Sequence, residues 1–173
     1  MDSYTIGKYL HVIVAIAWLG GAFGVVLLGH LAARAGDGER LIWVARMTET
    51  LAKLIFMPAS LVMLLLGLWL TWLDWSFAEA WIVFGILGVV MTGAIGGRFL
   101  TPMVKQLATL EAGAQRDAVA VKFFNTAKAD LIMLFTIVWA MVSKPQWADV
   151  WEILAMVLVI AAGAVFYLRP RKA

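Results

Sequence analysis

Long apolar runs separated by short polar segments dominate this chain. Five of them are near the ~20 mostly apolar residues that a helix needs to cross the hydrocarbon layer of a bilayer. They run from about Ile6 to Leu31, Leu54 to Trp72, Trp81 to Leu100, Phe123 to Val142, and Val150 to Leu168. No run alternates as a strand would, and a helix satisfies its own backbone groups in lipid. The pattern predicts an all-α integral membrane bundle of about five transmembrane helices, formed by one domain over residues 1–173.

The basic residues predict how this bundle is oriented. They gather in the segments after the first and third runs and in the tail, at Arg34, Arg40, Arg46, Lys105, Arg116, Lys122, Arg169, Arg171 and Lys172. Residues 73–80 contain no lysine or arginine, and the connection after the fourth run has only Lys144. Because basic loops stay in the cytoplasm, we expect the N-terminus outside and the C-terminus inside.

The polar segments between the spans also have structure of their own. Residues 40–53 are amphipathic, with Glu49 and Lys53 at i,i+4 spacing, and residues 103–130 have a helical pattern broken near Gly113. We therefore predict helical cytoplasmic extensions of the spans. Tryptophans 69, 72, 75 and 81, with 139, 147 and 151, cluster at the other side and fit an interfacial belt.

Composition agrees with a membrane location and narrows the chemistry. The chain is 64% hydrophobic and 14% charged, whereas a soluble domain has about 45–50% and about 25%. The absence of cysteine excludes thiolate sites and disulfides. The net charge of +3 is explained by loops that face anionic lipid, so we expect a lipid bilayer as partner and no nucleic acid.

His11 is the first candidate for chemistry, because an ionisable group inside a membrane helix is a functional candidate by default. At 100° per residue it shares a helix face with small side chains and Trp18, whereas Gly20 and Gly24 form a GxxxG pair on the opposite face, suited to packing against a neighbouring helix. Three interpretations remain open: an axial ligand to haem, a ligand to a soft metal such as copper, or a structural hydrogen bond.

Each ligand interpretation names further residues. For haem b, we expect Trp18 to stack near the porphyrin and Lys144 to hold a propionate. His30 is ~28 Å along the same helix from His11, so the two cannot bind one iron. For copper, the methionines of the same half, Met63 and Met141, would complete the site with His11.

Two further features lie within or at the ends of the spans. Arg98 and Asp130 fall at similar depth, so we predict an ion pair; the alternative is that Arg98 snorkels to lipid phosphate while Asp130 faces water. Lys144 precedes Pro145 and is either a stop signal with a snorkelling lysine or a cation at the mouth of a pocket beside His11. Pro58 and Pro102 predict local kinks.

Several stretches together resemble a family of predicted bacterial integral membrane proteins defined only as a domain of unknown function. They are KYLHVIVAIAWLGGAF, FMPASLVMLLLGLWL and IMLFTIVWAMVSKP, within residues 7–145. More distantly, Lys8, His11, Trp18, Gly20 and Gly21 are similar to the start of the copper-resistance D (CopD) and HemJ-type protoporphyrinogen oxidase families. The HemJ resemblance implies a haem b ligand at His11, and the CopD resemblance implies copper handling across the membrane.

The sequence thus favours a small haem-b-associated protein of a bacterial inner membrane, spanning it several times and acting in electron transfer or haem-linked redox chemistry. A copper-handling transport protein is the alternative. A third reading is an accessory subunit without chemistry, whose glycine and tryptophan faces dock a homo-oligomer or a larger membrane complex. The sequence leaves open whether the chain is an enzyme.

Overall fold

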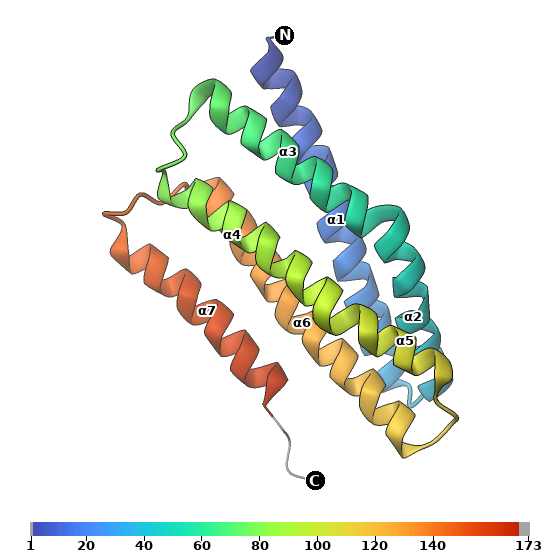
Figure 1. The fold of residues 1–173 in the computed structure, drawn as a ribbon. Helices are drawn as coiled ribbons and strands as arrows, with labels where there is room; N and C mark the ends of the chain where they lie inside the picture. Colours follow the sequence, from blue (N-terminus) through green and yellow to red (C-terminus); the bar gives the residue numbers. More distant parts are fainter. Residues whose placement is uncertain (1, 170–173) are drawn as a thin grey trace.

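The computed structural model describes residues 2–169, and every regular element in that part is a helix (Figure 1). The elements are α1 (Ser3–Arg34), α2 (Gly38–Leu51), the π-helical turn η1 (Ala52–Phe56), α3 (Met57–Asp74), α4 (Ala80–Ile95), the π-helical turn η2 (Gly96–Leu100), α5 (Thr101–Thr109), α6 (Ala114–Ser143) and α7 (Val150–Leu168). The predicted basic tail residues Arg171 and Lys172 lie outside the described residues.

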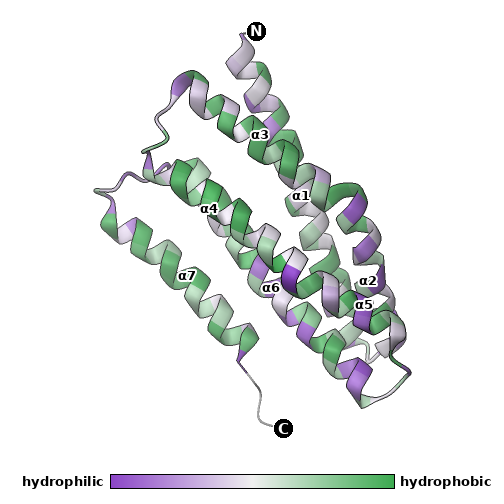
Figure 2. Cartoon of the chain, in the orientation of Figure 1, coloured by the Kyte–Doolittle hydropathy of each residue, from purple (hydrophilic) through white to green (hydrophobic). Residues whose placement is uncertain are grey.

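Five continuous helical stretches are long and apolar enough to cross a membrane, which confirms the predicted architecture. They are Ser3–Arg34, Gly38–Asp74, Ala80–Thr109, Ala114–Ser143 and Val150–Leu168. Hydrophobic residues fill their middle parts, and hydrophilic residues gather mainly towards the ends (Figure 2). The predicted helical extensions are α2, α5 and the first turns of α6, which continue the spans instead of forming loops.

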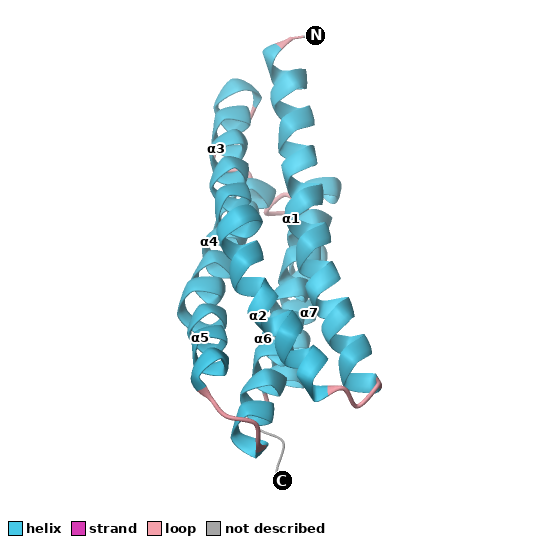
Figure 3. Cartoon of the chain, turned by 90° about the vertical axis from the view of Figure 1, so that its right-hand side faces the viewer, coloured by secondary structure: helices cyan, strands magenta, loops and turns pink. Residues whose placement is uncertain are grey.

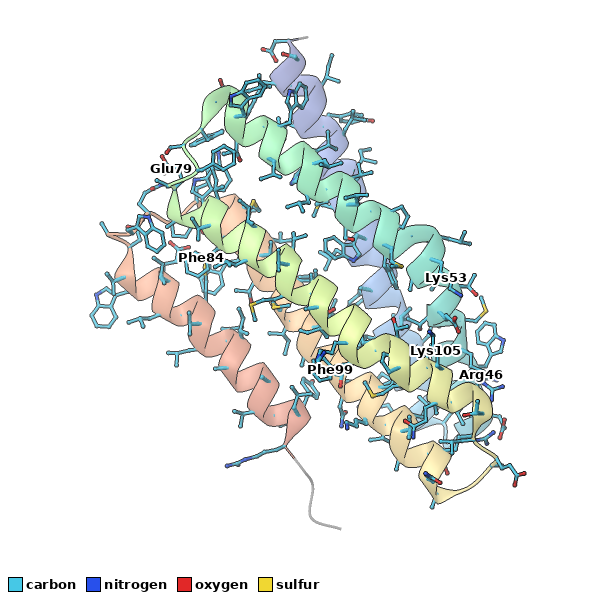
Figure 4. The ribbon with its side chains drawn as sticks, viewed as in Figure 1. Arg46, Lys53, Glu79, Phe84, Phe99 and Lys105 are labelled. Carbon is cyan, nitrogen blue, oxygen red and sulfur yellow. The ribbon has the colours of Figure 1, made fainter. Side chains whose placement is uncertain are left out.

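Short turns join the helices at the two ends of the bundle (Figure 3). We call one end the basic end, because it holds Arg40, Arg46, Lys53, Lys105 and Arg116. The other is the tryptophan end, which holds Trp69, Trp72, Trp75, Trp81, Trp147 and Trp151. Figure 4 shows Arg46, Lys53 and Lys105 at the basic end and Glu79 at the opposite end.

Local sequence explains where the first helices start and stop. The carboxylate of Asp2 accepts a hydrogen bond from the amide of Thr5 at 2.7 Å, and Asp37 does the same for Arg40 at 2.9 Å. Both aspartates are therefore N-caps that satisfy an otherwise unpaired amide of the first turn. Between α1 and α2 the chain reverses at Gly36, whose φ of 67° is readily accessible only without a Cβ.

The two π-helical turns each end two residues before a proline. The amide of Met57 bonds the carbonyl of Ala52, and the amide of Thr101 bonds that of Gly96, so the ladder runs from i to i−5 directly before Pro58 and Pro102. A proline cannot donate to the α-helical ladder, and the π turn shifts the bonding register around it. The chain bends where α2 passes into α3 (Figure 1).

The closely packed core lies at the basic end. Buried side chains from α1, α2, α5 and α6 form it: Val25, Ile42, Val44, Ala45, Met103, Val104, Leu107, Ala120, Phe123 and Phe124. Arg46 fastens α2 to α5, since its guanidinium donates to the carbonyl of Leu107 at 2.8 Å. Arg116 pairs with Glu39 and so joins α6 to α2. Farther along, α1 packs on α3 and α6, and α6 lies between α4 and α7.

The glycines of α1 correct one expectation. A Cβ placed on Gly20 or Gly24 would meet no atom within 4 Å, so the GxxxG face does not pack against another described helix. Instead Gly7 and Gly29, on the His11 face, touch the rings of Trp69 and Phe124. The small residues beside His11 therefore allow close helix contact, and the spacing of Gly20 and Gly24 alone did not identify the packed side.

Candidate functional site

Four of the predicted site residues lie around one cleft at the tryptophan end. This cavity of about 200 Å³ opens between α1, α3, α4 and α6. Its lining includes His11 of α1, Met63 of α3, Met141 of α6 and Lys144, which directly follows α6. The sequence predicted these residues from depth alone, and the fold brings them to the same space.

The His11 imidazole has one ring nitrogen without a partner. Its Nδ1 is buried and makes no hydrogen bond, and the Met63 backbone lies near the ring. A Cβ on Gly67 would lie 3.3 Å from the His11 ring, so glycine there makes room for the imidazole. The arrangement leaves a buried ring nitrogen of His11 without a hydrogen-bond partner.

Lys144 lies at the mouth of the cleft, held by aromatic rings. Its ammonium is 4.0 Å from the centroid of the Trp75 ring and 5.1 Å from that of Trp81, and the two rings are perpendicular to each other. Lys144 also ends α6 in a left-handed conformation, with φ of 51°, just before the fully buried Pro145. It is thus both a helix stop and a cation at the pocket mouth, which combines the two interpretations.

The two methionines approach the cleft from opposite sides. Met141 packs its terminal methyl against Gly85 of α4, and Met63 is on α3 one turn from Gly67. Both side chains are half-buried, which leaves their thioethers within an apolar cleft. Within residues 2–169, no group of three or more His, Cys, Asp or Glu side chains converges, so any metal held here would depend on His11 and thioether sulfur.

Trp18 lies away from this cleft. It is buried and lines a second cavity, towards the basic end, together with Asp130. His11 and Trp18 share a helix face, but seven residues separate them by about 10 Å along the axis. Its predicted place beside a porphyrin at His11 therefore receives no support from the geometry, while His30 is exposed near the end of α1.

The predicted ion pair between Arg98 and Asp130 does not form. Within the described part of the chain the ion pairs are Arg40–Asp37, Lys53–Glu49 and Arg116–Glu39. Arg98 is exposed in the π-helical turn η2, whereas an Asp130 oxygen is buried without a partner. The depth estimate placed both residues near one level, but Arg98 points outward, as the snorkelling alternative anticipated for that residue.

Sequence reasoning missed the aromatic part of the cleft. Trp75 and Trp81 were expected to be belt residues, yet Trp81 is only 9% exposed and Trp75 donates its indole N–H to the Tyr4 hydroxyl at 2.9 Å. Trp72 and Trp151, which are 77% and 85% exposed, are placed as lipid anchors would be. Hydropathy and position cannot separate these two groups, because both lie at the same end of a span.

A comparison with family models shows the family of this chain. A model described as predicted integral membrane protein (DUF2269) matches residues 5–145. The chain belongs to this family. No curated protein and no solved structure matches it. The DUF2269 region contains α1 to α6 almost completely, and every helix that lines either cavity is among them, whereas α7 lies beyond the match and lines neither.

Proposed function

We propose that this DUF2269 protein handles a soft transition metal, of which copper is the best fit, in a bacterial inner membrane. The metal would bind at the tryptophan end of the bundle. The observation that carries the proposal is the unpartnered Nδ1 of His11, a residue that lines one cleft together with Met63 and Met141. Imidazole combined with thioether sulfur suits Cu(I).

The position of the cleft suggests what the metal site does. With the basic end in the cytoplasm, His11 opens towards the outer face of the membrane, where Lys8, Tyr4 and Lys144 surround the entrance. A site at this depth can take up or release an ion without carrying it through the whole bilayer. The function supported best is therefore metal acquisition or transfer, and no bond-making step is assigned to the chain.

Haem b, the ligand that the sequence favoured, is the second candidate. Lys8 and Lys144 both line the cleft, and two cations suit the two propionates of a haem. The volume argues against enclosure, because about 200 Å³ is little more than the ~150 Å³ that accommodates one benzene ring. A porphyrin bound at His11 would extend beyond this chain, so haem requires a second copy or a partner subunit to cover it.

Metal titration and an optical spectrum of the purified protein test these candidates together. We expect the protein to compete for Cu(I) with a chelator of known affinity, and His11→Ala to lower that affinity at least about 10-fold, as loss of a metal ligand or its support does. Met63→Leu and Met141→Leu should weaken binding as well. His30→Ala and Met91→Leu are matched controls, since both residues are exposed and neither lines the cleft.

The outcomes separate the three functional classes. Copper binding that depends on His11 and the methionines supports the proposal. A Soret band that His11→Ala abolishes, without copper binding, replaces it with the haem function. A protein that binds neither copper nor haem and co-purifies with partner subunits would contradict both the copper and the haem function. It would support the accessory-subunit interpretation.

A further inference from the structure

A second cavity lies nearer the basic end and has a different chemical character. Its volume is about 180 Å³, and the same helical stretches that line the outer cleft surround it. Four hydroxyl groups and two carboxyl groups are among the residues that line it: Thr48, Ser60, Thr92, Thr101, Glu49 and Asp130. No lysine, arginine or histidine lines it. The cavity therefore offers oxygen ligands and negative charge.

Asp130 is the unbalanced charge in this cavity. It lies on α6 within a membrane-spanning stretch, and its Oδ1 is buried without a hydrogen-bond partner. Glu49, the other carboxylate, is neutralised by Lys53 at 2.8 Å, and Lys105 also lies near it. An unpaired carboxylate in the interior of a membrane protein is costly and marks an ion or proton site. One uncompensated charge calls for one monovalent cation.

Two hydroxyl groups of this cavity keep lone pairs free. Thr48 donates its proton to the Val44 carbonyl at 2.9 Å, and Ser60 donates to the Met57 carbonyl at 2.9 Å. A hydroxyl whose proton is used in this way still has lone pairs for a metal ion. Thr92 reaches the Asp130 carboxyl group itself. Hard oxygen donors of this kind suit alkali and alkaline-earth cations and are unsuited to soft metals.

The backbone around the cavity is irregular on two sides. Both π-helical turns contribute to its wall, η1 through Ala52 and Phe56, and η2 through Gly96, Gly97 and Leu100. Single π turns within α-helices occur frequently at functional sites. A Cβ on Gly96 or Gly97 would meet nothing within 4 Å, so no side chain from another helix fills the space beside η2.

The second cavity is also close to the outer cleft. On α3 the lining passes from Met63 to Ser60, and on α4 it passes from Val89 to Thr92. Three residues of helix are about 4.5 Å, or slightly less than one turn. The two spaces are therefore stacked along the same helices and separated by one thin apolar layer.

We propose that this inner cavity binds a monovalent alkali cation, with Asp130 supplying the charge and the surrounding hydroxyls the neutral oxygen ligands. The site is separate from the metal site at His11 and does not depend on it. Na⁺ is the probe of choice because the space is small and its ligands are hard. A cation bound here would stabilise the packing of η2 against α6.

Two measurements on the full-length protein in detergent or lipid nanodiscs test the site. The first is the rate at which dicyclohexylcarbodiimide, a reagent for protonated carboxyl groups in apolar surroundings, labels Asp130, followed by mass spectrometry. The bound cation displaces the reactive proton, so we expect Na⁺ at ten times its Kd to slow labelling about 11-fold. Choline chloride at equal ionic strength should have no effect. Thr92→Val should raise the Na⁺ concentration needed for half protection.

The second measurement is the melting temperature as a function of Na⁺, again against choline. We expect a rise in the wild type and in Glu79→Gln, a matched carboxylate change at the opposite end (Figure 4), but none in Asp130→Asn. If Asp130→Asn does not fold, or if wild-type Asp130 resists the reagent, the other measurement decides. Labelling that ignores Na⁺ and K⁺, or an Na⁺-dependent rise that persists in Asp130→Asn, overturns the proposal.

Discussion

The ammonium of Lys144 lies 4.0 Å from the centre of the Trp75 ring, so the C-cap residue of α6 is held by the C-cap residue of α3. This contact joins two connections at the tryptophan end, 69 residues apart in sequence. Lys144 has a left-handed φ of 51°, and its side chain lines the cleft. Aromatic faces here replace a carboxylate as the partner of a cation.

A double-mutant cycle of Trp75→Leu and Lys144→Met should detect this contact. We expect a coupling free energy of about 0.5–2 kcal/mol between the two changes, the range for cation–π pairs from exposed to desolvated sites. Unfolding measured by circular dichroism in a mild detergent gives the four stabilities. Additive effects of the two single changes would show that the ring and the cation do not stabilise each other.

A pair of glycines on α1 allows a matched test of packing. A methyl group on Gly29 would overlap the Phe124 ring, so Gly29→Ala should destabilise the protein by about 1–3 kcal/mol through overpacking. The same change at Gly20 meets no atom and should stabilise the helix by up to about 1 kcal/mol. Thermal unfolding of both variants, with Gly29→Ala/Phe124→Leu as the rescue, checks the result. Equal effects at the two glycines would contradict the packing.

The glycines of α1 also show which features of the fold the sequence could predict. Hydropathy predicted the five spans because a run of ~20 apolar residues near the bilayer length leaves few alternatives. Depth along each helix was predictable for the same reason, since 1.5 Å per residue is fixed. Rotation about the helix axis was not, because it depends on which neighbours pack. Gly20 and Gly24 were therefore assigned to the wrong side, and for Arg98 an ion pair and an outward position both stayed open.

For the candidate site, too, depth along a helix was predicted better than the surroundings of a helix face. His11 and Met141 were predicted at one level and do line one cleft, whereas Trp18 was predicted from its face and lies one level deeper. The only signs of the π-helical turns in the sequence are Pro58 and Pro102, which were predicted to be local kinks. Hydrogen-bond register is decided by tertiary packing around a missing donor, and no local pattern specifies it.

The start of α1 should respond to pH through Asp2. The hydrogen bond from the Thr5 amide holds the pKa of the Asp2 carboxyl below its usual value of 3.8. Since the folded pKa lies below the unfolded one, the stabilisation of the first turn is complete above the unfolded value and is lost as pH falls through the folded value. Amide hydrogen exchange at Thr5 should become faster, relative to a mid-helix amide, on acidification through this range.

The variant Asp2→Asn provides the control for that titration. Asparagine is a good N-cap but does not ionise, so exchange at Thr5 should no longer depend on acid beyond its intrinsic chemistry. Asp2→Ala should show fast exchange at every pH. An acid response that is identical in wild type and in Asp2→Asn would mean that another group controls the first turn.

The orientation of the bundle, on which the proposed metal function depends, can be tested by reporter fusions at three turns. Insertions after Gly113, at the basic end, should give a fluorescent protein that folds in the cytoplasm and an inactive alkaline phosphatase. Insertions within residues 76–78 and 146–148, at the tryptophan end, should give the reverse, because arginine- and lysine-rich connections stay inside. The insertion within residues 76–78 is the more decisive of the two tests, because this turn contains no lysine, whereas Lys144 adjoins residues 146–148. Phosphatase activity at Gly113 together with fluorescence at 76–78 would place the His11 cleft on the cytoplasmic side. The copper site would then have to draw on the intracellular pool.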